Sequence, residues 1–232
     1  MQILRQPWIV LRHPIVVQRR LNPAIVVSCL FVGLLANAAP RQKSTPQTVP
    51  DSKLKTIEDP EEYAVWSALL LKKYGVDPSK ELIIVDRTIS SKTGPFTGLT
   101  YGLTYTGYKP PTGEPELGCD FESKGANMSL LETKFDSKLK YLLVPEARLK
   151  EVFGIDSSGK SHGDGWQHFY EVYPAALAIF AVSRVAFNFG RNQALVFVIR
   201  KGGGLNGSGV FYLMTKRSGS WDVEKAVMIW IS

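Results

Sequence analysis

The chain has 232 residues, of which 44% are hydrophobic and 21% charged, and its formal net charge is +7. This length fits one domain with appendages, and the ordinary apolar fraction excludes a chain that is disordered throughout. Four arginines and no acidic residue precede residue 38, so the other 24 basic and 21 acidic residues leave a charge of only +3. Because no basic stripe with interleaved aromatic residues is present, the sequence argues against nucleic-acid binding.

Residues 1–38 have the features of a secretory signal peptide. Two arginines precede an apolar run at 24–35, and the small residues that follow offer a cleavage site after Ala38. The run has about a dozen residues, whereas a membrane span needs about 20. The sequence therefore predicts a secreted or periplasmic protein with no stable membrane span after cleavage. Two alternatives stay open: an uncleaved anchor, and a lipoprotein attached through Cys29.

A polar segment and then the first ordered element are expected next. Residues 39–58 contain Lys, Ser, Thr, Gln and Pro with few large apolar residues, and they predict a flexible linker because little burial offsets the entropy of ordering. A helix is expected from Asp59, an N-cap residue followed by Pro60 and two acids, to a stop at Gly75. Residues 59–232 should form a single domain.

The middle of the chain alternates short elements with one long loop. Residues 91–118 contain many glycines and prolines, three tyrosines and no sustained periodicity of apolar residues. They predict a long loop, and loops of this length are usually either functional or mobile. The other elements predicted here are a strand at 81–90, a short helix at 117–124, a strand at 140–144 and a helix at 145–153.

A further helix is expected to begin at Asp164, which fits an N-cap with Gln167 at the capping-box position. Four aromatic residues recur along it at helical spacing: Trp166, Phe169, Tyr170 and Tyr173. A strip this aromatic is rarely left in water, so we expect it to pack on the C-terminal sheet. The alternative is a recognition face for a carbohydrate, a peptide or a partner protein.

The last third of the chain holds four runs of alternating β-forming residues, at 178–188, 193–200, 210–216 and 221–231. Runs joined by such short turns pair antiparallel, because a parallel crossover needs a dozen or more residues. The second run is apolar on both faces, as in a central covered strand. We therefore predict an α+β fold: an antiparallel meander of these strands plus one or two from the N-terminal half, with helices packed on at least one face.

Two glycine-containing motifs imitate nucleotide-binding loops. Residues 154–161 match the P-loop pattern G-x-x-x-x-G-K-[ST], but a P-loop needs a strand before it and a helix after it, and here a predicted helix precedes a glycine-rich segment. Nucleotide binding at 154–161 is thus a remote alternative. Residues 202–207 match G-x-G-x-x-G but lie in a predicted hairpin. The dinucleotide-binding fingerprint requires a strand followed by a helix, so this match does not predict dinucleotide binding. The backbone N–H groups of this loop could instead form a nest that binds an anion, and the candidate residues are Gly203, Gly204, Asn206 and Gly207.

One tight group of residues could carry acid–base or metal chemistry: His162, Asp164 and His168. Their spacing fits no closed zinc pattern, and no metal or cofactor is predicted. A hydrolase, metal-dependent or acid–base, centred on these three residues is the second functional hypothesis. Cys119 is the only cysteine after signal removal, so no intramolecular disulfide is expected in the mature chain.

The C-terminal strings resemble a group of uncharacterised secreted bacterial proteins. The residues that carry the resemblance lie at 183–188, 193–198, 207–213, 219–223 and 230–232, and the resemblance covers 165–232. It implies export and the extent of the domain, and it carries over no catalytic residue because the group has no established activity. The first functional hypothesis is therefore a binding or accessory module of the cell envelope with an unknown envelope or extracellular ligand.

Overall fold

The computed structural model describes residues 53–75, 77–90, 113–156 and 164–232, all within one compact unit, Ser44–Ser232. Several predicted features lie outside the described residues: the signal peptide, the linker up to residue 52, most of the loop at 91–118, the second half of the P-loop pattern and His162.

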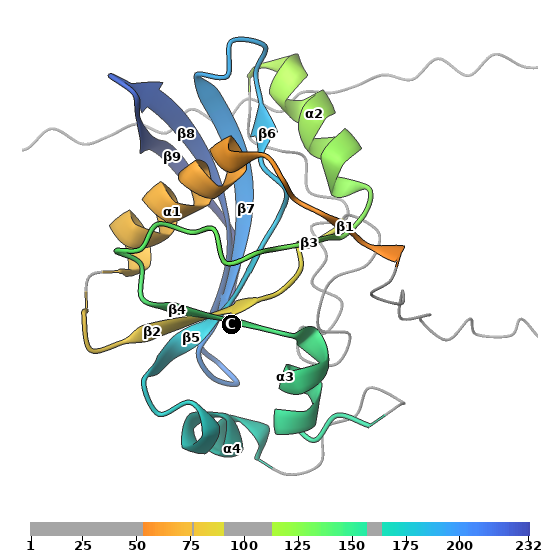
Figure 1. Ribbon diagram of the computed structural model, residues 1–232, viewed down its shortest axis with the longest axis vertical. Helices are drawn as coiled ribbons and strands as arrows, with labels where there is room; N and C mark the ends of the chain where they lie inside the picture. The colour runs from red at the N-terminus through yellow and green to blue at the C-terminus, as the bar shows by residue number, and fades with distance from the viewer. Residues whose placement is uncertain (1–52, 76, 91–112, 157–163) are drawn as a thin grey trace, which may run out of the picture. The chain divides into compact units, whose positions relative to one another are not determined.

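Four helices and a seven-stranded sheet make up most of the described fold (Figure 1). The helices are α1 Pro60–Tyr74, α2 Pro115–Gly125, α3 Glu146–Val152 and α4 Gly165–Val172. The strands of the main sheet are β2 Glu81–Val85, β4 Tyr141–Val144, β5 Ala176–Val182, β6 Ala186–Phe187, β7 Gln193–Lys201, β8 Gly207–Arg217 and β9 Ser220–Ile231. A separate short pair consists of β1 Lys55–Thr56 and β3 Ser129–Leu130.

The main sheet has the order β4-β2-β5-β7-β8-β9, with β6 also paired to β7. Strands β5, β7, β8 and β9 are antiparallel neighbours, so the predicted α+β fold with its C-terminal meander is confirmed. The predicted run at 178–188 is divided into β5 and β6, because the Ser183 hydroxyl accepts a hydrogen bond from the Phe197 N–H at 2.9 Å and takes a backbone group's place in the ladder.

Two further strands, β2 from the N-terminal half and β4 from the middle of the chain, extend the sheet and are parallel to each other and to β5. Their connections are long crossovers that contain α2, α3 and α4, and such crossovers permit parallel pairing. The sheet is therefore mixed, with a parallel part at β4-β2-β5 and an antiparallel part beyond β5.

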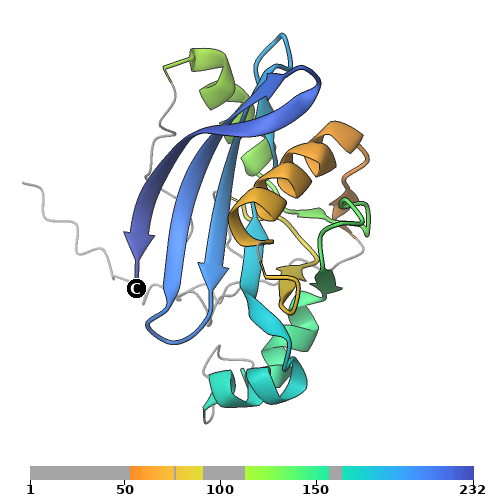
Figure 2. The ribbon, with the colours of Figure 1, turned by 90° about the vertical axis from the view of Figure 1, so that its left-hand side faces the viewer.

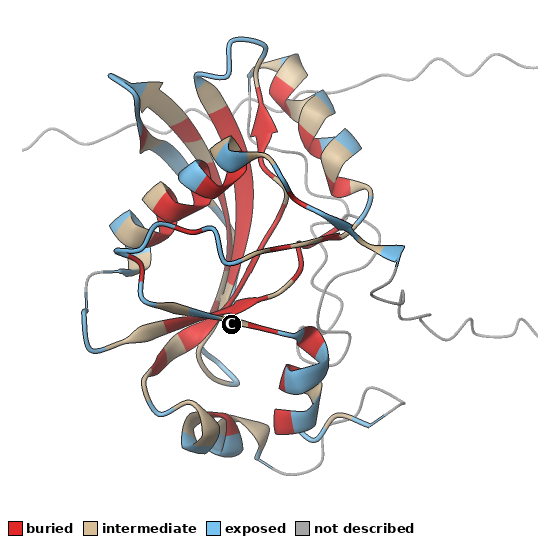
Figure 3. Ribbon diagram, viewed as in Figure 1, coloured by how far each residue is buried: buried red, intermediate tan, exposed pale blue. Residues whose placement is uncertain are grey.

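Helices cover both faces of the sheet (Figure 2). Helix α1 packs on one face through Trp66 and Leu69, and α2, α3 and α4 contribute to the core on the other face through Phe121, Leu149 and Phe169. Strand β7 lies between the two cores and is buried along most of its length (Figure 3). The sequence prediction of a central strand with two apolar faces is therefore confirmed.

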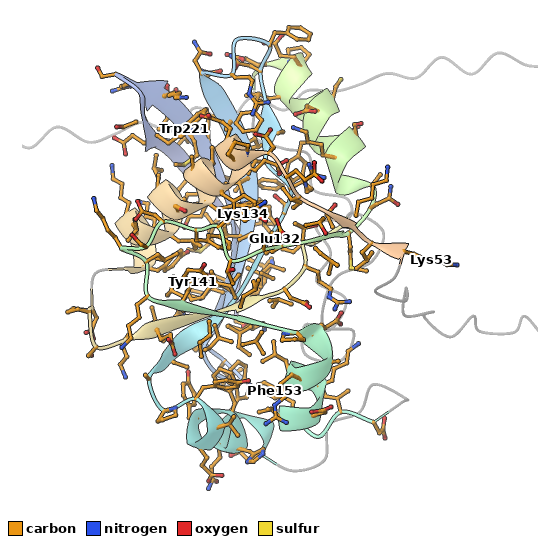
Figure 4. The ribbon with its side chains drawn as sticks, in the orientation of Figure 1. Lys53, Glu132, Lys134, Tyr141, Phe153 and Trp221 are labelled. Atoms are coloured by element: carbon orange, nitrogen blue, oxygen red, sulfur yellow. The ribbon has the colours of Figure 1, made fainter. Side chains whose placement is uncertain are left out.

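Helix α1 begins and ends at the predicted residues because both of its ends are capped. The Asp59 side chain accepts a hydrogen bond from the Glu61 N–H at 2.9 Å, and the Gly75 N–H donates to the Leu70 and Leu71 carbonyls. An N-cap of this kind contributes about 1 kcal/mol. The helix is tied to β9 as well, since the Trp221 indole N–H donates to Glu61 Oε1 at 2.6 Å (Figure 4).

Strand β9 forms one outer edge of the sheet, with β8 as its neighbour. Its register with β8 shifts twice, between Gly209 and Val210 and between Leu213 and Met214. Both shifts place an additional residue in β9, so this strand carries two bulges. None of the helices in the described part of the chain combines the length and the apolar character needed to cross a bilayer.

Candidate functional site

Helix α4 and the β7–β8 hairpin meet at the end of the sheet where β5 begins (Figure 1). The Tyr170 hydroxyl donates to the Gly202 carbonyl at 2.9 Å and joins the two elements directly. Both groups of candidate residues that the sequence singled out, one on α4 and one in the hairpin, therefore have members at this end of the sheet. We call the half-buried aromatic side chains of α4, Trp166, Tyr170 and Tyr173, the α4 aromatic face.

The α4 aromatic face is anchored by two buried phenylalanines. The Phe169 ring is buried and stacks on Phe153, at the end of α3, with a centroid distance of 5.6 Å. Trp166 meets Phe153 edge-on at 4.9 Å, and Tyr170 and Tyr173 contact Phe169 at 5.1 Å and 5.3 Å. Figure 4 labels Phe153, which lies between α3 and α4. The strip thus packs on the core as predicted, while part of three rings stays in solvent.

Asp164 and His168 lie on the exposed side of α4. The Asp164 side chain accepts a hydrogen bond from the Gln167 N–H at 3.2 Å, which confirms the predicted N-cap, and the His168 Nδ1 lies 3.3 Å from Glu171 Oε2. Within the described residues no three His, Cys, Asp or Glu side chains gather as a metal site would require. His162 lies outside those residues. The structure therefore shows only that Asp164, at the N-cap, and His168 are both exposed on α4.

The hairpin uses part of its own backbone to hold its shape. The Gly202 N–H donates to the Asn206 carbonyl at 2.7 Å, and the Asn206 N–H donates to the Gly203 carbonyl at 3.5 Å. The Gly207 N–H donates to the Ser232 carbonyl at 3.1 Å. Two of the four predicted anion-nest residues, Asn206 and Gly207, therefore use their backbone N–H groups in hydrogen bonds within the protein. Gly204 is exposed at the tip of the hairpin.

A second group of polar residues lies at the carboxyl ends of the parallel strands, where open α/β sheets commonly bind ligands. Arg87, directly after β2, is 3% exposed and donates to Asp86 Oδ1 at 2.9 Å, and its Nη1 lies 3.5 Å from Glu146 Oε2 at the start of α3. Lys150 pairs with the other Glu146 oxygen at 2.9 Å. The four charges neutralise one another, so this group ties α3 to β2.

A further ion pair follows β5 and joins it to α1. The Arg184 guanidinium bonds both carboxylate oxygens of Glu62 at 2.5–3.2 Å, and the Val185 N–H donates to the same carboxylate at 3.0 Å. The Glu62 side chain is only 1% exposed. Each side-chain nitrogen and oxygen that is buried in the described residues has a hydrogen-bond partner. These groups therefore hold the fold together, and we place the candidate binding surface at the α4 aromatic face.

The sequence analysis missed Arg200, which lies near the end of β7, next to the β7–β8 hairpin that Tyr170 contacts. Its Nη1 donates to Asn206 Oδ1 at 2.8 Å. Burial raises the pKa of Tyr170, and the positive charge of Arg200 acts in the opposite direction. A cation at the end of an apolar run, next to a glycine-rich turn, is the one signal in the sequence that pointed here.

Comparisons with family models, with curated proteins and with solved structures found no match for this chain. The resemblance of 165–232 to a group of secreted bacterial proteins therefore stays a prediction.

Proposed function

We propose that the protein is an exported binding module of the cell envelope and that it binds a saccharide on the α4 aromatic face. The main support for this proposal is that three aromatic rings are fixed by packing on the core yet remain partly exposed to solvent: Trp166, Tyr170 and Tyr173. Rigid aromatic side chains supply large contact areas at a low cost in conformational entropy, and they dominate recognition surfaces.

The surroundings of these rings suit a saccharide better than an apolar partner. The helix that carries the rings also carries exposed polar groups, Gln167 and Glu171, which hydrogen-bond each other at 3.1 Å. A sugar ring offers an apolar face for stacking and hydroxyls for such groups. The hydrolase alternative has weaker support, since Asp164 serves as a helix cap and His168 contacts Glu171 on the surface.

Export is the other half of the proposal, and it rests on the signal-peptide features of residues 1–38. Protein recovered outside the cytoplasm should begin at Ala39, because the small residues before it fit signal peptidase. Intact-mass measurement of the secreted protein tests this. The matched control is Ala38→Phe, which should block cleavage by replacing a small residue at the cut. Recovery of the wild type with residues 1–38 still attached would favour a membrane anchor.

Binding is tested on an array of neutral and acidic oligosaccharides with protein expressed from the complete chain. The wild type should be retained by at least one saccharide, and Trp166→Ala should weaken that binding by about tenfold or more, a loss of about 1.4 kcal/mol. Trp166→Phe should keep part of it because a ring remains.

The matched control for this array is Phe189→Ala. Phe189 is 91% exposed in the β6–β7 turn, outside the α4 aromatic face, so its removal should leave binding unchanged. If the wild type binds none of the saccharides, or if Trp166→Ala and Phe189→Ala bind equally, the proposal is wrong.

A further inference from the structure

Arg200 projects from the α1 side of β7 and folds back over the hairpin. Its cross-strand neighbours are Phe180 in β5 and Ser208 in β8. A β-carbon at Gly202 would lie 3.3 Å from the Arg200 Nη2 and 3.2 Å from the Asn206 side-chain nitrogen. The missing side chain at Gly202 thus leaves the space in which the guanidinium sits against Asn206.

Two tyrosines, one at each of two helices, pack against the strands and the hairpin that hold Arg200. Tyr74, at the end of α1, has its ring 4.8 Å from Phe180, the residue directly across from Arg200. Burial raises the pKa of Tyr74 and of Tyr170, and the charge of Arg200 opposes both shifts. The Tyr74 hydroxyl bonds the Tyr212 hydroxyl at 2.9 Å, and the Tyr170 hydroxyl donates to the Gly202 carbonyl at 2.9 Å, so Tyr170 is the tyrosine that meets the backbone next to Arg200.

Among the described residues, Arg200 and Arg217 form no ion pair with a carboxylate, unlike four other arginines. Arg87, Arg148, Arg184 and Arg191 each form an ion pair with a carboxylate. In the part of the chain that the structure describes, Arg200 hydrogen-bonds only to the neutral amide of Asn206. A guanidinium has five N–H donors in a planar fork that matches a carboxylate. Most of these donors remain for a ligand.

We propose that Arg200 binds the carboxylate of an acidic sugar unit, such as a uronic acid, while the saccharide lies on the α4 aromatic face. Tyr170 makes the connection, because it contacts Trp166 at 6.3 Å on one side and bonds Gly202, under the guanidinium, on the other. This assignment rests on the proposed function and names the ligand class within it. A planar fork gives Arg200 two parallel hydrogen bonds to one carboxylate.

The test compares uronic-acid oligosaccharides with their methyl esters, which keep the sugar rings and remove the charge. The wild type should bind each acid about tenfold or more tightly than its ester, the fold-change expected for hydrogen bonds to a charged group. Arg200→Gln should abolish this preference, so that acid and ester bind equally well to the variant. Arg200→Lys should restore only part of it, because an ammonium lacks the fork.

Lys201→Gln is the matched control. It removes the same charge one residue further along β7, where the side chain points to the opposite face and lies over Trp230 at 5.1 Å. The preference for acids should survive this change, and thermal unfolding should confirm that each variant is folded.

Three outcomes overturn the proposal. The first is equal binding of acid and ester by the wild type, and the second is a preference that survives Arg200→Gln. The third is Arg200-dependent binding of a peptide carboxylate with no binding of any uronic acid. The proposed function fails separately, when no saccharide is bound or when binding does not depend on Trp166.

Discussion

Replacing Arg184 with alanine should lower the free energy of unfolding by about 3–5 kcal/mol, because the change leaves a buried carboxylate without its cation. The Glu62 side chain is 1% exposed and receives three hydrogen bonds from Arg184 and one from the Val185 N–H. The hydrogen bond with Glu62 raises the pKa of Arg184, so the guanidinium keeps its charge at neutral pH. Urea denaturation of the variant and the wild type measures the loss.

The matched control is Arg148→Ala, in which the same side chain is removed from an exposed pair with Glu151. Exposed pairs contribute little, so the denaturation midpoint of this variant should stay at the wild-type value. Adding Glu62→Gln to Arg184→Ala should recover part of the loss, since the double variant no longer buries an unpaired charge. An Arg184→Ala midpoint equal to that of Arg148→Ala would show that the pair does not hold α1 to β5.

Phe197→Asn should abolish cooperative folding. The Phe197 ring is 1% exposed and lies 4.7 Å from Phe211 within the second core. Emptying such an aromatic site costs about 3–5 kcal/mol, and burying an amide without partners adds about 1–3 kcal/mol. Together these losses are comparable with the 5–15 kcal/mol that stabilises a typical domain, taken as a rough range. Loss of the near-ultraviolet circular dichroism signal would report the unfolding.

Phe189→Asn makes the same chemical change at a side chain that is 91% exposed. This variant should unfold at the wild-type midpoint, because neither a cavity nor a buried amide is created. A folded, cooperative Phe197→Asn protein would mean that the core around β7 can rearrange to admit water or to hydrogen-bond the amide.

Much of the local structure could be predicted because its causes lie within a few residues. Asp59 and Asp164 bond to backbone N–H groups two and three residues away, and the sequence places both helix starts correctly. The alternation of apolar residues in β7 likewise reports its two buried faces. The direction of β2 and β4 was not predicted, because it depends on the path of long crossovers and not on residues within either strand.

The candidate site was harder to predict for the same reason. Tyr170 and Gly202 lie 32 positions apart, and Arg184 and Glu62 lie 122 positions apart. No spacing rule connects such partners. The sequence analysis named His162, Asp164 and His168, which are close in the chain, as the centre of its second functional hypothesis, and it gave Arg200 no role. Helical spacing did identify Trp166, Tyr170 and Tyr173, because α4 sets their positions locally.

The two bulges of β9 bear on how the protein behaves at high concentration. An outer strand of 12 residues offers a row of backbone groups to which a strand from another molecule could add. A regular incoming strand would lose its match with β9 at each bulge, near Glu224 and near Ile229, so only short stretches could pair. This interruption disfavours fibre growth through β9 from the folded state.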